Sequence, residues 1–200
     1  MKDKNVPNKL TKFRIVLSII ILFIMLFPWD MVNISFKRFL INGIIILDTK
    51  MVIVGVLFII ASITDFLDGY LARKYKLVSD YGKVMDAIAD KILVNGLLIV
   101  LTYEGYIHPI IPVIIILRDI IVNTLKMIAG EKEKAVGAIK SGKFKTMFLM
   151  VGLTLKLFGN FPFGLINIAL DDFLIITATI LSIISGIEYY NMFKKYLTKN

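Results

Sequence analysis

Four aspartates lie within 26 residues of one another at the border of a strongly apolar part of the chain. Asp65 and Asp68 are three residues apart, and Asp86 and Asp90 are four apart, so each pair occupies one face of a helix. Four carboxylates held close together repel one another unless cations share them. An all-oxygen set is the one that Mg²⁺ or Mn²⁺ prefers, and two ions bridged by carboxylates suit chemistry on a diphosphate. These residues therefore predict a metal-dependent site with two divalent ions.

Other kinds of reactive site have little support in the composition. The chain has no cysteine, which excludes thiolate catalysis and disulfides, and its one histidine, His108, falls in an expected loop far from the aspartates. The net charge of +9 is compatible with nucleic acid or with anionic lipid headgroups. Because the lysines and arginines flank apolar runs, we expect contact with membrane lipids and phosphate-bearing substrates and no binding of nucleic acid.

Two glycines and an arginine accompany the aspartates. Gly69 and Gly82 leave room on the two helices for a ligand or for close packing of the helices. Arg73, one turn beyond Gly69, has a guanidinium suited to a phosphate or an aspartate, although an arginine at a membrane interface also has a purely structural explanation.

The elements that must position these residues are helices in a membrane. Hydrophobic residues make up 58% of the chain, and the apolar runs are long enough to cross a bilayer. We predict an all-α integral membrane protein of one domain, 1–200, with six transmembrane helices at Phe13 to Trp29, Thr49 to Tyr75, Lys83 to Tyr103, Pro109 to Ala129, Phe144 to Phe161 and Phe173 to Tyr196.

Positive charges orient this bundle. They gather in the amino-terminal segment, in the second and fourth connections and in the tail, whereas 104–108 and 160–172 contain no lysine or arginine. This bias predicts cytoplasmic termini and an active site that faces the cytoplasm in a multi-pass protein of the cell membrane. The segment from Asn5 to Lys12 suits a short interfacial helix, or a frayed basic tail.

The aspartate run reads D-x-x-D-G-x-x-A-R, eight residues, G-x-x-x-D-x-x-x-D. It resembles the motif of the CDP-alcohol phosphotransferases, membrane enzymes of phospholipid synthesis, at every specified position. The resemblance implies three metal ligands and a base that takes the proton of an acceptor hydroxyl. It also implies three contacts to the CDP portion of the donor. The implied metal ligands are Asp65, Asp68 and Asp86, and the implied base is Asp90, which also touches a metal. The implied contacts to the CDP portion are Gly69, Arg73 and Gly82.

Further elements resemble the bacterial phosphatidylglycerophosphate synthase subgroup of that family. They are the opening N-x-P-N-x-L-T-x-x-R from Asn5 to Arg14, the pair Arg118-Asp119, and G-K-x-K-T from Gly142 to Thr146. Asp119 replaces the usual glutamate. An anionic acceptor needs cations, and the candidates are Arg118, Lys143 and Lys145, although topology alone also accounts for either lysine. Asn8 and Thr11 are expected near the donor's phosphates, or as helix caps.

The resemblance implies transfer of a phosphatidyl group from CDP-diacylglycerol to glycerol 3-phosphate, which gives phosphatidylglycerophosphate and CMP. A sister enzyme that uses inositol phosphate, serine or another alcohol shares the aspartate motif and is the nearest alternative. A cation transporter is a further alternative, but it gives no reason for the glycines and the arginine to accompany the acids. Small residues on the helices are compatible with a homodimer.

Overall fold

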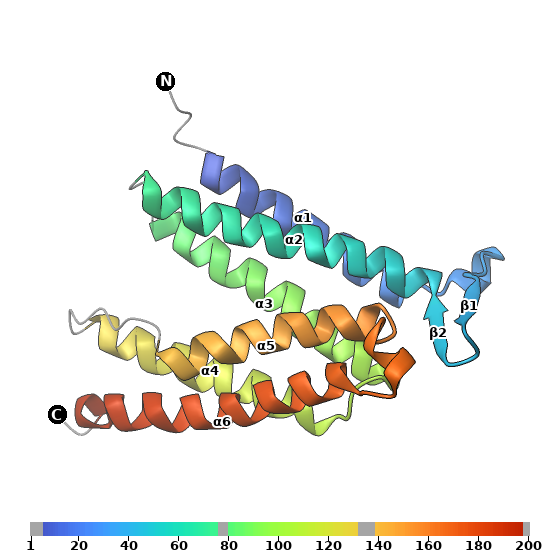
Figure 1. Ribbon diagram of the computed structural model, residues 1–200. Helices are drawn as coiled ribbons and strands as arrows, with labels where there is room; N and C mark the ends of the chain where they lie inside the picture. The colour runs from blue at the N-terminus through green and yellow to red at the C-terminus, as the bar shows by residue number, and fades with distance from the viewer. Residues whose placement is uncertain (1–5, 76–79, 132–138, 198–200) are drawn as a thin grey trace.

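The computed structural model describes residues 6–75, 80–131 and 139–197. Within these residues six long helices form a bundle (Figure 1). The predicted helices are all present, with ends that differ by up to four residues, except that the first helix begins seven residues before the predicted Phe13. Their bounds are α1 (Val6–Leu26), α2 (Thr49–Lys74), α3 (Asp80–Tyr103), α4 (Ile110–Glu131), α5 (Lys140–Leu157) and α6 (Leu170–Leu197), and two short 3₁₀ helices are η1 (Trp29–Val32) and η2 (Phe163–Ile166).

The bundle has two groups of three helices. α1 packs against α2 and α3, while α6 packs against α5 and α4, and α2 also meets α5. Figure 1 shows the first residues of α1 and the last turn of α6 at the same end of the bundle. One apolar core joins the groups, with fully buried side chains such as Ile21 on α1, Phe58 on α2, Leu97 on α3, Ile115 on α4 and Leu153 on α5. This packing fixes the helix faces that carry the site.

The predicted all-α class is confirmed, and a β-hairpin occupies the connection between α1 and α2, which was expected to be a loop. β1 (Arg38–Ile41) pairs antiparallel with β2 (Ile45–Asp48). The hairpin lies beside η1, at the end of the bundle opposite to the start of α1 and the last turn of α6 (Figure 1). The turn is closed by the N–H of Ile44, which donates to the carbonyl of Ile41 at 3.1 Å. Its central residues, Asn42 and Gly43, have φ of 50° and 72°. Asn-Gly adopts such positive angles readily, so this dipeptide between apolar residues was the overlooked hairpin signal.

The predicted interfacial helix at the amino terminus is also corrected. Val6 to Leu26 form one continuous helix, so residues 6–12 are its first two turns and not a separate element. Pro7 lies in the first turn, where a missing N–H breaks no intrahelical hydrogen bond. Thr11 and Arg14 on this helix are buried and donate hydrogen bonds to aspartates of α2. The polar start of α1 is therefore packed inside the bundle.

The outward faces of the helices are apolar, as expected of a membrane protein. Large exposed side chains include Phe23 on α1, Ile63 on α2, Leu117 on α4 and Ile180 on α6. In the described part of the chain, two segments meet a strict test of length and composition for crossing a membrane, Thr49–Tyr70 and Leu170–Lys194.

Tight packing and a buried ion pair hold α5 against α6. A Cβ on Gly152 would lie 2.8 Å from a side-chain carbon of Ile175 and 3.2 Å from its backbone nitrogen. Near the end that carries the hairpin, Lys156 Nζ lies 2.8 Å from Asp171 Oδ2 and 2.6 Å from Asp172 Oδ1. The Lys156 and Asp171 side chains are 10% and 8% exposed, so this pair is largely withdrawn from solvent.

Candidate active site

The motif aspartates of α2 and α3 surround an arginine of α1. Arg14 donates from Nη1 to Asp65 Oδ1 and from Nη2 to Asp86 Oδ1 at 2.6 Å, and Nη2 also lies 3.5 Å from Asp68 Oδ2. The hydroxyl of Thr11 donates to the same Asp68 oxygen at 2.5 Å. The packing of α1 on both α2 and α3 brings these groups together, so three carboxylates from two helices converge on one guanidinium.

The donor set of this cluster fits a hard divalent ion, because Asp65, Asp68 and Asp86 supply only carboxylate oxygens. Asp65 and Asp86 are 39% and 53% exposed, which leaves their outer oxygens reachable. Within the described residues, however, no three acidic, histidine or cysteine side chains are already arranged around a common metal position. The guanidinium of Arg14 lies where the three carboxylates meet.

Asp90 does not join the Arg14 cluster and instead lines a separate pocket. This cavity of about 540 Å³ lies among α3, α4, α5 and α6, within the usual range for small-molecule sites. Its polar wall is strongly basic and carries Lys91, Arg118, Lys126, Lys143 and Lys145. The structure thus divides the four motif aspartates between two neighbouring places, three around Arg14 and one at the wall of a basic pocket.

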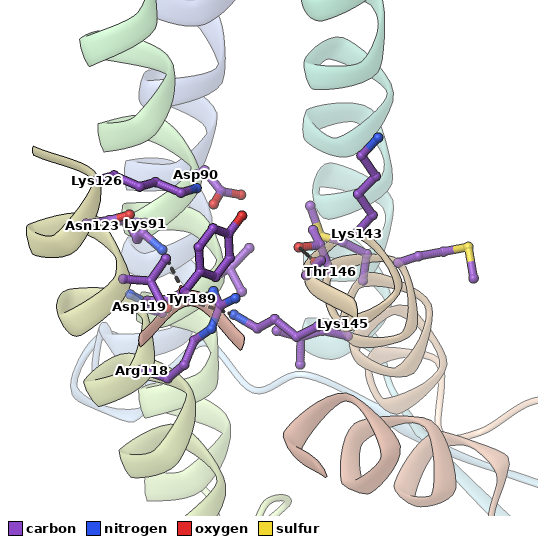
Figure 2. A pocket seen from close by; sticks show the side chains of 17 residues that line it. Asp90, Lys91, Arg118, Asp119, Asn123, Lys126, Lys143, Lys145, Thr146 and Tyr189 are labelled. Atoms are coloured by element: carbon purple, nitrogen blue, oxygen red, sulfur yellow. Dashed lines mark hydrogen bonds and ion pairs between the residues drawn. The ribbon is translucent and has the colours of Figure 1, made fainter. Parts of the chain in front are cut away.

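Asp119 organises the cations of this pocket. Its carboxylate accepts from Lys91 Nζ at 2.5 Å, from Lys145 Nζ at 2.9 Å and from Arg118 Nη1 at 2.9 Å (Figure 2). Asp119 and Lys145 are 7% and 4% exposed. One negative charge therefore holds three positive charges close together, and the group keeps an excess of positive charge that suits a phosphate.

Arg118 is fixed on three sides. Its Nη2 donates to Ser185 Oγ on α6 at 2.7 Å, and its guanidinium carbon lies 5.6 Å from the ring centre of Tyr189. Its buried Nε has no hydrogen-bond partner among the described residues, and neither has the buried Oδ1 of Asn95, which lines the same pocket. A donor and an acceptor thus remain available beside the cavity.

The two lysines predicted for the acceptor both line the pocket, but they differ in direction. Lys145 extends toward Arg118 and Asp119, whereas Lys143 is exposed and extends away from them (Figure 2). Among the other predicted residues, Gly69 lies on α2 and Gly82 near the start of α3, and both are partly exposed. The side chains of Asn8 and Arg73 lie outside the described part of the structure.

A model of the CDP-alcohol phosphatidyltransferase family matches residues 4–184, which include the Arg14 cluster and every residue that lines the basic pocket except Tyr189. The chain belongs to this family. The family predicted from the aspartate motif is therefore confirmed, and members of this family generally use a divalent metal ion.

Several CDP-diacylglycerol--glycerol-3-phosphate 3-phosphatidyltransferases resemble this family member. The Bacillus subtilis protein is 34% identical over 187 residues, which cover 94% of each chain. The Rickettsia felis protein is 34% identical over 196 residues, 97% of this chain and 98% of the relative. The Mycoplasma pneumoniae protein is 37% identical over 156 residues, 78% of this chain and 69% of the relative.

Sequence reasoning gave no role to several residues that the structure places in this CDP-alcohol phosphatidyltransferase site, among them Arg14, Lys91, Asn95 and Lys126. A signal for Arg14 was present, because Thr11, Arg14 and Ser18 recur at helical spacing on one face of an otherwise apolar helix, and all three are buried. Lys91 and Asn95 are polar residues within the apolar length of α3, which is costly without a partner or a purpose.

Proposed function

We propose that the protein transfers the phosphatidyl group of CDP-diacylglycerol to glycerol 3-phosphate and releases CMP. The observation that carries this proposal is the basic pocket, with Asp90 at its wall and the other three motif aspartates on the adjacent helix faces. The names of the full-length relatives from Bacillus and Rickettsia support the same donor and acceptor.

The acceptor's phosphate is assigned to the cations around Asp119. Among the described residues, Arg118 has an unpartnered Nε–H, and Lys145 Nζ carries three N–H groups but donates only to Asp119, so both retain donors for phosphate oxygens. Lys143 extends elsewhere and serves the entrance of the pocket. The free Oδ1 of Asn95 is suited to accept a hydrogen bond from the hydroxyl of the acceptor that does not react.

Asp90 acts as the general base in this proposal. It takes the proton of the attacking hydroxyl, whose oxygen forms a bond to the lipid-bearing phosphorus. The bond from that phosphorus to the CMP oxygen breaks, and CMP leaves with the electron pair. A carboxylate between the acceptor pocket and the other motif aspartates is placed for this proton transfer.

The donor side is built from the aspartate motif. Asp65, Asp68 and Asp86, with Asp90 beside them, would hold one or two Mg²⁺ or Mn²⁺ ions, which neutralise the diphosphate and stabilise the leaving CMP. Five further residues are assigned to the donor, namely Asn8, Thr11, Gly69, Arg73 and Gly82. Thr11 keeps Asp68 oriented through its hydroxyl.

We further propose that all six helices cross the cell membrane, with both termini and the site on the cytoplasmic side. The apolar outward faces and the shared end of α1 and α6 support this arrangement. So does the concentration of lysines and arginines in the connections at that end. The site would then meet both its soluble acceptor and its lipid donor.

The first test is CMP release by the purified protein in lipid with CDP-diacylglycerol. Glycerol 3-phosphate, inositol phosphate, inositol and serine are offered separately, each with Mg²⁺, Mn²⁺ or a chelator. Release that requires glycerol 3-phosphate and metal is expected. Release with another acceptor would preserve the reaction class and overturn the assignment of the pocket, and no release from the folded protein would overturn the proposed activity.

A further inference from the structure

Arg14 is the most deeply buried charged side chain among the described residues, with 1% exposure. It lies on α1, where Leu17 and Ile21 on the following turns belong to the apolar core. An arginine inside such a bundle is costly unless it is paired. Among the described residues, all the side chains that pair with it are carboxylates of the proposed metal site, so the guanidinium belongs to that site and not to a separate structural ion pair.

The charge balance of this cluster depends on Arg14. Asp65, Asp68 and Asp86 bring three negative charges, and one guanidinium compensates only one of them. Lys12, on the same helix, is exposed and forms no ion pair with these three described aspartates. Arg14 therefore offsets part of the repulsion among the three carboxylates, which still attract further positive charge.

We propose that Arg14 is a positioning residue that serves as the resident counter-cation of the metal site. Its guanidinium holds the carboxylates of α2 and α3 together when no divalent ion is bound, and it leaves them when one binds. This inference rests on the proposed metal site. The inference goes beyond that site, because it predicts that Arg14 has different partners in the metal-free and the metal-bound protein.

The contacts of Arg14 support such an exchange, because they occupy the carboxylate oxygens that a metal ion would use. A divalent ion of the proposed kind needs oxygen ligands at about 2.0 to 2.2 Å in a compact shell, and a guanidinium between the same carboxylates excludes that shell. No metal-like arrangement of three acidic side chains exists within the described residues while Arg14 is in place. Thr11 keeps its hydrogen bond to Asp68 on the α1 side, so that carboxylate stays oriented as the arginine withdraws.

The test measures Mn²⁺ binding directly, by electron paramagnetic resonance titration of the purified full-length protein without lipid donor or acceptor. Arg14→Gln removes the competing cation and is expected to bind Mn²⁺ about tenfold more tightly, equivalent to about 1.4 kcal/mol. In chelator the same variant is expected to melt at a lower temperature than the wild type, because the carboxylates then repel one another. Saturating Mn²⁺ should remove most of that difference.

Lys12→Gln is the matched control, since it removes the same charge from the same helix without contact to the aspartates. Its Mn²⁺ affinity should stay within about twofold of the wild type. Arg14→Lys keeps the charge but loses the fork that reaches several carboxylates, and its affinity should lie between those of the wild type and Arg14→Gln.

Equal or weaker Mn²⁺ binding by folded Arg14→Gln would overturn the proposal. So would failure of this variant to fold in Mn²⁺, because the metal should replace the lost cation. The result is independent of the acceptor: a protein that binds Mn²⁺ as expected but releases no CMP with glycerol 3-phosphate contradicts the proposed function alone. A wild type that binds no Mn²⁺ contradicts both.

Discussion

Replacement of Arg118 tests the acceptor pocket most directly. Arg118→Ala removes a guanidinium that holds Asp119 at 2.9 Å and Ser185 at 2.7 Å and still has an unpartnered Nε–H beside the cavity. Asp119 keeps Lys91 at 2.5 Å and Lys145 at 2.9 Å, so the substitution leaves no buried carboxylate without a cation. The main loss should therefore fall on the ligand and not on the fold.

The magnitude follows from one charge-assisted contact to the phosphate. Such a hydrogen bond contributes about 1.5 to 3 kcal/mol, which corresponds to a fall of roughly 10- to 150-fold in kcat/KM for glycerol 3-phosphate. Because the phosphate does not react, ground state and transition state lose the same contact. The fall should appear as a raised KM, with kcat largely retained.

The assay follows CMP release against glycerol 3-phosphate concentration at fixed CDP-diacylglycerol and metal. Lys140→Gln is the control, because Lys140 begins α5 and is exposed but does not line the pocket. Its KM should match that of the wild type. A KM for glycerol 3-phosphate that stays within twofold in a folded Arg118→Ala protein would refute the placement of the phosphate at Arg118.

Four other substitutions test the remaining features. Asp90→Asn should abolish CMP release while donor binding is retained, whereas Asp65→Asn should weaken both Mn²⁺ and donor binding; full turnover in Asp90→Asn would rule it out as the base. Lys156→Met leaves the buried Asp171 without its cation and should lower the free energy of unfolding by about 3 kcal/mol in detergent. An unchanged unfolding midpoint would show that this pair contributes no stability. Gly152→Ala places a Cβ 2.8 Å from the side chain of Ile175 on α6. Overpacking of this kind should lower the free energy of unfolding by about 1 to 3 kcal/mol. A more stable Gly152→Ala protein would contradict the close approach of α5 and α6.

The helices could be predicted because their signals are local. Each apolar run is long enough to specify a helix without knowledge of its neighbours, and the observed bounds of α2 differ from the predicted ones by a single residue. The hairpin also has a local signal in Asn42-Gly43, although a connection between two membrane spans is more simply predicted as a loop. The single helix from Val6 was missed for another reason: Thr11 and Arg14 make its start polar, and their partners are aspartates of another helix.

The sequence by itself determined the family, the helical class and the residue types available for chemistry, because motif spacing and apolar periodicity are properties of neighbouring residues. Only the tertiary structure decided which of those residues come together in each site. It placed Arg14 from α1 between carboxylates of α2 and α3, left Asp90 at a different pocket, and gathered Lys91, Arg118 and Lys145 around Asp119. Except for the adjacent Arg118 and Asp119, these partners are separated by 26 to 72 positions in the sequence. Charges so far apart in the chain meet only after the helices have packed, so no local pattern specifies which of them pair.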